Sequence, residues 1–206
     1  MGKANHRNFV GMGGVMKKYQ IIYADPPWEY EFSHTRSRAI NDYHTLSKEE
    51  ICAFKVKDIV EENSILLLWV TFPKLEWAIP VMNAWGFQYV TNAFTWIKLN
   101  HNNKQPFWGM GYYTRSNAEI CLLGKRGEGV QAKSHSINSV IMHPIMQHSK
   151  KPPIIREKIV EIFGDLPRIE LFARKEKSLF EHKDWQGWDV WGNEVESDID
   201  LNNRPE

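Results

Sequence analysis

The chain has 206 residues, of which 42% are hydrophobic, and its formal net charge is +1 at pH 7. This length favours one domain with a substantial core, and the near-neutral charge excludes a global basic field for nucleic-acid binding. The two cysteines, Cys52 and Cys121, form no CxxC pair, which argues against a structural zinc site. Neither a signal-peptide segment nor a run of about 18 apolar residues is present, so we expect a cytoplasmic protein without membrane spans.

The first 18 residues combine glycine and basic residues without hydrophobic periodicity, so we interpret residues 1–18 as a flexible leader. The run Gly11-Met12-Gly13-Gly14 suggests a glycine-rich phosphate loop. Such a loop requires a strand before it and a helix after it, and neither is predicted here.

The stretch from Tyr19 to Trp28 (YQIIYADPPW) predicts a buried strand that ends at Asp25-Pro26-Pro27-Trp28. A proline has no N–H, fixes its own φ and keeps the preceding residue extended. We therefore expect the carbonyls of Asp25 and Pro26 to point outward, with no local donor to occupy them. Because open α/β sheets bind ligands at the carboxyl ends of their strands, this stretch is a candidate site.

The next segment, residues 29–46, is polar and long for a connection, which is typical of a functional or mobile loop. Ser47 and Glu50 then form a capping-box pattern that predicts a helix through about Val60. The continuous apolar run Ile65–Val70 predicts a strand covered on both faces of a sheet.

A second helix is predicted to begin at Pro73 and to stop at Gly86. Its expected apolar stripe consists of Leu75, Ala78, Met82 and Trp85. Because an interior proline costs about 3 kcal/mol, Pro80 predicts either a kink or two short helices.

Two further strands are predicted at Val90–Leu99 and Ala118–Lys125, separated by the polar, aromatic loop 100–117. Residues 126–147 lack periodicity and are expected to form a loop.

A third helix is predicted from Pro152-Pro153 to Phe163, closed by Gly164, followed by a strand at Arg168–Ala173. The alternation of strands and helices predicts an α/β fold, with a mostly parallel central sheet and helices on both faces.

These elements carry seven sequence blocks that together resemble the MT-A70 family, whose members are adenine-N6 methyltransferases that use S-adenosylmethionine (AdoMet). In order, the blocks are DPPW (25–28), ILLLWV (65–70), FTWIK (94–98), AEICLLG (118–124), HSKKP (148–152), IELFAR (169–174) and WGNE (191–194). The resemblance implies a Rossmann-like methyltransferase fold in circularly permuted order, with the catalytic strand first and the cofactor-binding strand IELFAR near the end. It covers a single domain at residues 19–196, similar in size to compact bacterial and phage members, and leaves residues 197–206 as an expected disordered tail.

The DPPW block is expected to be catalytic, with roles for Asp25, Pro26, Pro27 and Trp28. The exocyclic amine of adenine is a poor nucleophile, because its lone pair is delocalised into the ring. Acceptors on both amino hydrogens would return that lone pair to nitrogen, so we assign this role to the Asp25 carboxylate and the Pro26 carbonyl. Trp28 is expected to stack on the extracted base. The alternative for Trp28 is a core indole.

Three further residues match substrate-pocket positions of the family. Tyr43 matches the pocket tyrosine, although a purely structural role in the loop is an equal alternative. Asn117 and Glu119 match positions that border the target adenine, and a carboxylate at the mouth of a buried strand supports a site role for Glu119.

The remaining matches concern the cofactor. Lys151 corresponds to the lysine near the methionine carboxylate of AdoMet, with an ordinary solvated lysine as the alternative. Phe172 and Arg174 lie in the block that replaces a glycine-rich turn. Asn193 and Glu194 match positions around the ribose hydroxyls, with a solvated turn as the alternative. Asp25 completes the expected cofactor-binding set, and neither the chemistry nor the histidine spacing predicts a metal site.

Substrate recognition is expected in loops 29–46, 100–117 and 126–147, which interleave basic and aromatic side chains. The compact form favours DNA over RNA as the substrate. Methylation of RNA, a non-catalytic nucleic-acid-binding partner of the same fold, and methylation of a small molecule or protein amide are the alternatives. A homodimer or a partner subunit is left open by the sequence.

Overall fold

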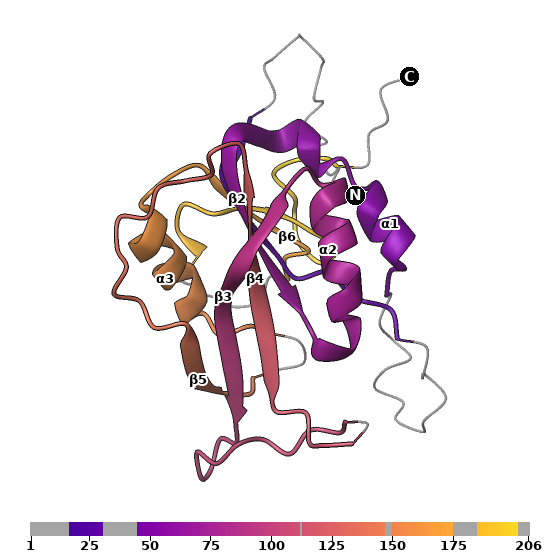
Figure 1. Cartoon of the computed structure of the whole chain (residues 1–206), viewed down its shortest axis with the longest axis vertical. Coiled ribbons are helices and arrows are strands. Elements are labelled where there is room, and N and C mark those ends of the chain that lie inside the picture. Colours follow the sequence, from indigo (N-terminus) through magenta and orange to yellow (C-terminus); the bar gives the residue numbers. More distant parts are fainter. Residues whose placement is uncertain (1–16, 31–44, 112, 147–149, 175–184, 202–206) are drawn as a thin grey trace, which may run out of the picture.

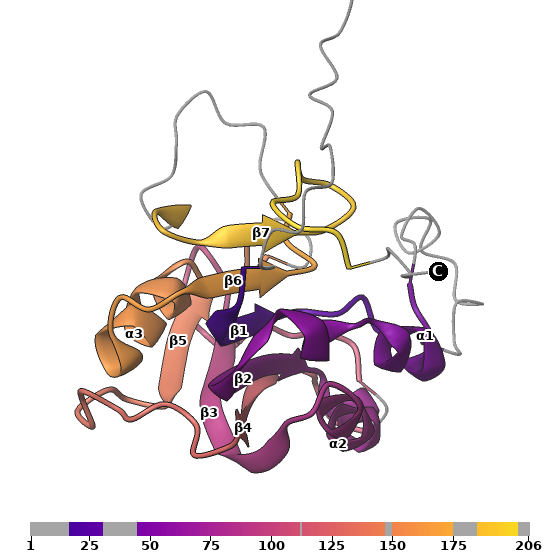
Figure 2. The same cartoon turned by 90° about the horizontal axis from the view of Figure 1, so that it is seen from above.

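The computed structural model describes residues 17–30, 45–111, 113–146, 150–174 and 185–201. In this part of the chain, one mixed sheet has the strand order β5-β3-β4-β2-β1-β6-β7, and helices cover both of its faces (Figures 1 and 2). The strands are β1 (Tyr19–Ala24), β2 (Val60–Val70), β3 (Gln88–Leu99), β4 (Ala118–Arg126), β5 (Val140–Pro144), β6 (Arg168–Leu171) and β7 (Asp189–Trp191). The helices are α1 (Lys48–Ala53), α2 (Leu75–Ala84) and α3 (Ile154–Phe163), and the 3-10 turns are η2 (Val56–Ile59) and η3 (Phe72–Lys74).

The sheet is mostly parallel, as predicted, and β4 is the reversed strand. β1 pairs in parallel with β2 and β6, β6 pairs in parallel with β7, and β3 pairs in parallel with β5. β4 is antiparallel to both of its neighbours, β2 and β3. Because β3 and β4 are consecutive and antiparallel, the segment that joins them leaves and re-enters the sheet at the same end of the strands.

The core lies in two layers, one on each face of the sheet. Helices α1 and α2 cover one face and α3 covers the other, as Figure 2 shows from above. In β1, Ile22 and Ala24 face the α1–α2 layer, whereas Ile21 and Tyr23 face the α3 layer. This alternation follows from the two-residue period of a strand, and burial on both faces explains the continuous apolar runs.

The first helix is shorter than predicted. The capping box is confirmed, because the Glu50 N–H donates to Ser47 Oγ and the Ser47 N–H donates to the Glu50 carboxylate. The helix nevertheless ends at Ala53, where Phe54 turns to an extended conformation. Its ring lies 5.4 Å from that of Phe172 and 5.0 Å from that of Trp191, so tertiary packing overrides the helical pattern.

Helix α2 passes through Pro80 without ending, so the alternative of two short helices is wrong. Pro80 lies on the exposed side of the helix, where water can satisfy the carbonyl that its missing N–H leaves without a partner. The predicted stripe is correct except at its start: Leu75 is exposed, and the buried positions are Ala78, Val81, Met82 and Trp85.

Two short edge strands were missed by the sequence patterns. β5 lies within the segment 126–147 that was expected to be a loop, and β7 lies in the segment after β6. Among the described strands, each pairs with one neighbour. The expected disordered tail, residues 197–206, is described as far as residue 201: Asp198 exchanges hydrogen bonds with Val190, and Leu201 is 4% exposed in the α1–α2 layer.

Candidate active site

The first strand ends near the centre of the sheet, and Asp25 follows its last residue. The chain leaves β1 towards α1 and β2 on one side, whereas β6, on the other side, is reached through α3 on the opposite face (Figure 2). The carboxyl end of β1 is therefore a topological switch point, where open α/β sheets bind ligands.

The two prolines hold the backbone after Asp25, but their carbonyls are not without donors. The Trp28 N–H donates to the Pro26 carbonyl at 2.9 Å, and the Leu46 N–H donates to the Pro27 carbonyl at 2.8 Å. The expectation of an unoccupied acceptor was therefore wrong for Pro26, because a tight turn brings the Trp28 N–H back within reach. A carbonyl oxygen has two lone pairs, so the Pro26 oxygen retains one acceptor position.

Four charged side chains form a continuous network next to this turn. Lys151 Nζ lies 2.6 Å from Asp25 Oδ2 and 3.3 Å from Glu119 Oε2. Glu119 Oε1 is also 2.5 Å from Lys98 Nζ. The second carboxylate oxygen of Asp25, Oδ1, accepts no hydrogen bond from any residue that the structure describes. The charges of four residues that are far apart in the sequence are thus gathered at one end of the sheet.

The pKa values of the two carboxylates that contact Lys151 are shifted in opposite directions. Burial raises the pKa of Asp25, Glu119 adds to this, and Lys151 only partly opposes it. Burial also acts to raise the pKa of Glu119, but Lys151 and Lys98 together outweigh it and lower that pKa below its ordinary value. For Lys151, burial acts to lower the pKa, but Asp25 and Glu119 raise it above the ordinary lysine value. The network therefore holds Lys151 as a cation at neutral pH.

Trp28 lies in the core, as in the alternative interpretation of this residue. It is 5% exposed, and its indole N–H donates to the Trp69 carbonyl at 3.1 Å. Its ring meets the edge of Trp77, with the centroids 6.5 Å apart. Little of the ring surface is left for a stacked base.

An aromatic residue that sequence reasoning missed, Tyr30, lies within electrostatic reach of the charged network. The Tyr30 hydroxyl bonds to Thr71 Oγ1 at the end of β2, and its ring faces Lys74 Nζ at 5.6 Å. Burial raises the pKa of Tyr30, and the charges of Glu119 and Asp25 add to that shift, so the hydroxyl lies within their electrostatic reach. Its position two residues after DPPW was the available signal.

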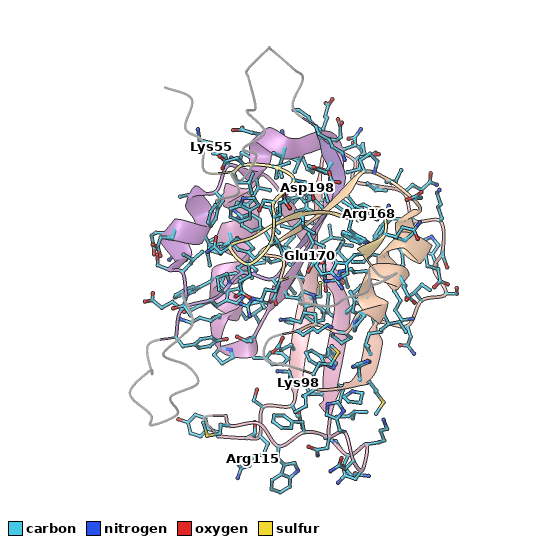
Figure 3. The ribbon with its side chains drawn as sticks, turned by 180° about the vertical axis from the view of Figure 1, so that it is seen from behind. Lys55, Lys98, Arg115, Arg168, Glu170 and Asp198 are labelled. Carbon is cyan, nitrogen blue, oxygen red and sulfur yellow. The ribbon has the colours of Figure 1, made fainter. Side chains whose placement is uncertain are left out.

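Lys98 is the second residue that was missed, although it lies in the quoted block FTWIK. It is the penultimate residue of β3, and Figure 3 labels it at the end of the sheet that carries the network. Its backbone N–H donates to the carbonyl of Asn117 at 2.8 Å, which fixes that candidate residue beside the end of β3.

The expected cofactor residues converge from two strand ends. The Ala173 N–H donates to the Trp191 carbonyl at 2.9 Å, which brings the residues after β6 beside those after β7. A Cβ on Gly192 would lie 2.4 Å from the Ala173 carbonyl oxygen, so only glycine allows this approach. Arg174 Nε then lies 3.9 Å from Glu194 Oε1.

The side chains at this second location have the chemistry that AdoMet requires. Asn193 and Glu194 are exposed in the turn after β7, where an amide and a carboxylate can bind ribose hydroxyls. Phe172 has φ +61° and packs against Trp85 and Trp191 at the floor of the turn. Burial lowers the pKa of Arg174, and the charges of Asp25 and Glu194 partly offset this shift. The pKa of Arg174 thus depends on charges from both halves of the candidate site. Together, Phe172, Arg174, Asn193 and Glu194 have the side-chain chemistry that fits the cofactor.

Tyr43 lies outside the described residues. Within the described ranges, no group of three or more His, Cys, Asp or Glu side chains is arranged to hold a metal ion. In the same ranges, no helix is long and apolar enough to cross a membrane.

Comparisons with known proteins agree with the sequence blocks. The profile of the MT-A70 family matches residues 19–194. The type II methyltransferase M.MunI of Mycoplasma sp is 32% identical over 198 residues, which cover 87% of this chain and 78% of M.MunI. The N(6)-adenosine-methyltransferase catalytic subunit METTL3 of Homo sapiens is 25% identical over 183 residues, or 88% of this chain and 29% of METTL3. The N(6)-adenine-specific methyltransferase METTL4 of Homo sapiens is 28% identical over 193 residues, or 87% of this chain and 38% of METTL4.

Proposed function

Because the chain belongs to the MT-A70 family, we propose that it transfers a methyl group from AdoMet to the N6 amine of adenine in DNA. The observation that carries this proposal is the Asp25 carboxylate at the switch point of the sheet. Lys151 holds one of its oxygens, and the other accepts no hydrogen bond from the part of the chain that the structure describes. The buried Pro26 carbonyl next to it supplies a second acceptor.

In the proposed reaction, Asp25 and Pro26 bind the two hydrogens of the adenine amine. Asp25 Oδ1 accepts one hydrogen, and the remaining lone pair of the Pro26 oxygen accepts the other. This arrangement localises the lone pair on N6, so that nitrogen can attack a carbon placed in line with it. Catalysis then consists mainly of positioning and electrostatic stabilisation.

Bound AdoMet supplies a methyl group on a positively charged sulfur, so the leaving thioether needs no acid. Forming the new N–C bond leaves one surplus proton on the amine nitrogen. Burial raises the pKa of Asp25 above that of an ordinary aspartate, which makes this carboxylate a better proton acceptor. Asp25 therefore orients the amine and accepts its surplus proton, while the electron pair of the broken sulfur–carbon bond stays with the thioether.

Lys151, Glu119 and Lys98 keep Asp25 in place for this role. The Lys151 ammonium fixes Oδ2 at 2.6 Å, which leaves Oδ1 directed elsewhere. Glu119, near the start of β4, contacts Lys151, and Lys98, near the end of β3, contacts Glu119. From the sequence, we expected Lys151 to bind the methionine carboxylate of AdoMet. The ammonium already contacts Asp25 and Glu119, so that carboxylate would be its third anionic partner.

Four residues are proposed to hold the other parts of AdoMet. Asn193 and Glu194 bind the ribose hydroxyls, Arg174 lies between them and Asp25, and Phe172 provides the apolar floor. On the substrate side, Trp28 supports the turn from the core, whereas Tyr30, at the mouth of the network, contacts the base.

DNA is favoured over RNA by the extent of the match. The chain spans most of M.MunI, a type II methyltransferase, and type II enzymes are a class defined by action on DNA. It spans only 29% of METTL3 and 38% of METTL4, so those proteins carry long additional segments. The match therefore extends over most of a type II methyltransferase but over less than two fifths of METTL3 or METTL4.

The test is incubation of the purified chain with methyl-labelled AdoMet and mixed-sequence DNA or RNA oligomers. We expect label on adenine N6 of DNA. We expect Asp25→Ala to lower the rate by at least about 100-fold while AdoMet binding persists. The matched control is Asp58→Ala, an exposed aspartate in η2, which should retain the wild-type rate.

Three outcomes would contradict the proposal. Label on cytosine or on protein would exclude adenine as the target. Label on RNA alone would replace DNA as the substrate. A full rate in Asp25→Ala would remove the carboxylate from the mechanism.

A further inference from the structure

The segment between β3 and β4, residues 100–117, begins and ends beside the charged network. It leaves the sheet just after Lys98 and returns just before Glu119, and these two side chains form an ion pair at 2.5 Å. Figure 1 shows this segment projecting beyond the end of the sheet, and Figure 3 labels Arg115 on it, beyond Lys98. Whatever molecule reaches Asp25 from this side must pass close to residues 100–117.

The segment is a folded hairpin within its described residues. The Phe107 N–H donates to the Lys98 carbonyl at 2.7 Å, and Gly109 forms a bridge with Ser116. A Cβ on Gly109 would lie 2.2 Å from the Ser116 carbonyl oxygen, so the two arms approach as closely as glycine permits. A tight hairpin holds its side chains at defined positions without support from the core.

The side chains that this hairpin presents are large and uncovered. Trp108 is 72% exposed, and Met110 and Tyr113 are also exposed. The Arg115 guanidinium lies 5.4 Å from the centre of the Trp108 ring. Aromatic rings are usually buried when no partner covers them, so an exposed set at the mouth of a site is a functional signal.

The positive charge of the hairpin indicates which class of partner it binds. Residues 100–117 contain Lys104 and Arg115 but neither aspartate nor glutamate, in a chain whose basic and acidic residues are otherwise nearly equal in number. Exposed rings stack on unpaired bases, and an adjacent guanidinium both supports the ring and contacts phosphate. A protein-binding patch would instead be expected to be apolar at its centre, with charges of both signs around it.

We propose that the hairpin at residues 100–117 binds the nucleic-acid strand on either side of the target adenine. In this arrangement Trp108 and Tyr113 stack on the bases left unpaired when the adenine is extracted, and Lys104 and Arg115 contact the phosphates. The partner is the nucleic acid of the proposed function, on which this inference rests. The hairpin thereby acts before chemistry, by holding an opened strand beside Asp25.

The test measures binding separately from methyl transfer, with a fluorescein-labelled, mixed-sequence single-stranded DNA of about 20 nucleotides. Two variants are compared with the wild-type chain: Trp108→Ala/Tyr113→Ala and Lys104→Gln/Arg115→Gln. We expect the aromatic variant to weaken binding at least about 10-fold, since one stacked base contributes about 1–3 kcal/mol. We expect the charge variant to reduce the slope of log K against log salt by about 1–2.

The matched controls lie far from the hairpin. Tyr89→Ala removes a half-exposed ring at the other end of β3, and Lys57→Gln removes an exposed charge in η2. Neither control should change the DNA affinity or the salt slope. The hairpin variants should retain the wild-type thermal midpoint and AdoMet affinity, because their side chains are outside the core and the network.

The outcomes separate this inference from the proposed function. Wild-type DNA affinity in both hairpin variants would overturn the inference, even if the wild-type chain methylates adenine. A wild-type chain that binds DNA through the hairpin but transfers no methyl group would overturn the proposed function alone. If sedimentation shows that the aromatic variant dissociates a dimer while each monomer keeps its DNA affinity, the hairpin contacts a second copy of the chain, and the inference is wrong.

Discussion

Glu119 faces two lysine ammoniums, whereas Asp25 faces one, and this difference separates the pKa values of two carboxylates that share Lys151. Burial acts to raise both pKa values, and the second lysine decides the result for Glu119. The acid with the raised pKa is the one proposed to accept the amine hydrogen. The acid with the lowered pKa serves as a fixed negative charge.

Glu119→Gln should move the acid limb of the activity profile to lower pH. Asp25 must be ionised to accept the amine hydrogen, so kcat/KM falls as pH decreases through its raised pKa. The glutamine removes a negative charge that raises this pKa and leaves Lys151 to act on Asp25 alone, and both effects lower the pKa. The check is kcat/KM for DNA methylation as a function of pH, whatever the maximal rate of the variant.

Glu128→Gln, which changes an exposed carboxylate in the turn after β4, serves as the control and should leave the limb in place. An acid limb that stays in place or moves to higher pH in Glu119→Gln would show that Glu119 does not set the titration of Asp25.

At the scale of elements, local signals and tertiary contacts determine different parts of the same helix. Helix α2 buries the stripe that its periodicity predicted, apart from Leu75, and Gly86 stops it with φ +84°. Helix α1 begins at its capping box but ends where Phe54 turns to an aromatic cluster with Phe172 and Trp191. A start signal can be read from four neighbouring residues, whereas this end depends on residues more than 100 positions away.

Pro80→Ala should stabilise the protein. Pro80 is exposed within α2, and its ring prevents a hydrogen bond to the Glu76 carbonyl, so alanine restores a bond without opening a cavity. We expect the free energy of unfolding to rise by about 1–3 kcal/mol, as measured by urea denaturation.

The control for this change is Pro73→Ala. Pro73 lies in the turn η3 before α2, where the chain needs no N–H, so no gain is expected. A Pro80→Ala variant no more stable than the wild type would mean that the helix at this position gains nothing from the N–H.

At the scale of the whole molecule, the sheet has two short edge strands, and the end of the described chain covers one of them. Asp198 bonds to Val190 of β7 through both its backbone N–H and its carboxylate. Leu201 then enters the α1–α2 layer of the core together with Trp191 and Ile51. Covering an edge in this way prevents its free N–H and C=O groups from pairing with another chain.

Leu201→Ala should lower the free energy of unfolding by about 2 kcal/mol, because it removes a buried side chain from the core. Met142→Ala, on the exposed face of the other edge strand β5, should change it by less than about 0.5 kcal/mol. Urea denaturation measures both, and equal stability of Leu201→Ala and wild type would show that the segment after β7 adds nothing to the core.

The sequence predicted much of the fold and three of the four members of the charged network, but not their contacts. Long apolar runs such as Ile65–Val70 identified the central strands, because these are buried on both faces. β5 and β7 were missed because an edge strand of three to five residues leaves too short a pattern. Asp25, Glu119 and Lys151 were selected through the family blocks, whereas Lys98 and Tyr30 were missed because their importance follows from neighbours distant in the chain.

The reversed direction of β4 has a consequence for how such a molecule can diversify. In a wholly parallel sheet, the chain that leaves a strand at the end carrying the active site must return through a crossover on a face of the sheet. Here β3 ends and β4 starts at that end of the sheet. Residues 100–117 therefore form an insert whose two ends are held together by the paired positions Ile97 and Ala118. Its length and composition can change without altering strand register or helix packing. Exchanging this insert between relatives would change the residues around the entrance of the site, while Asp25 and the three residues that hold it, Lys98, Glu119 and Lys151, stay in place.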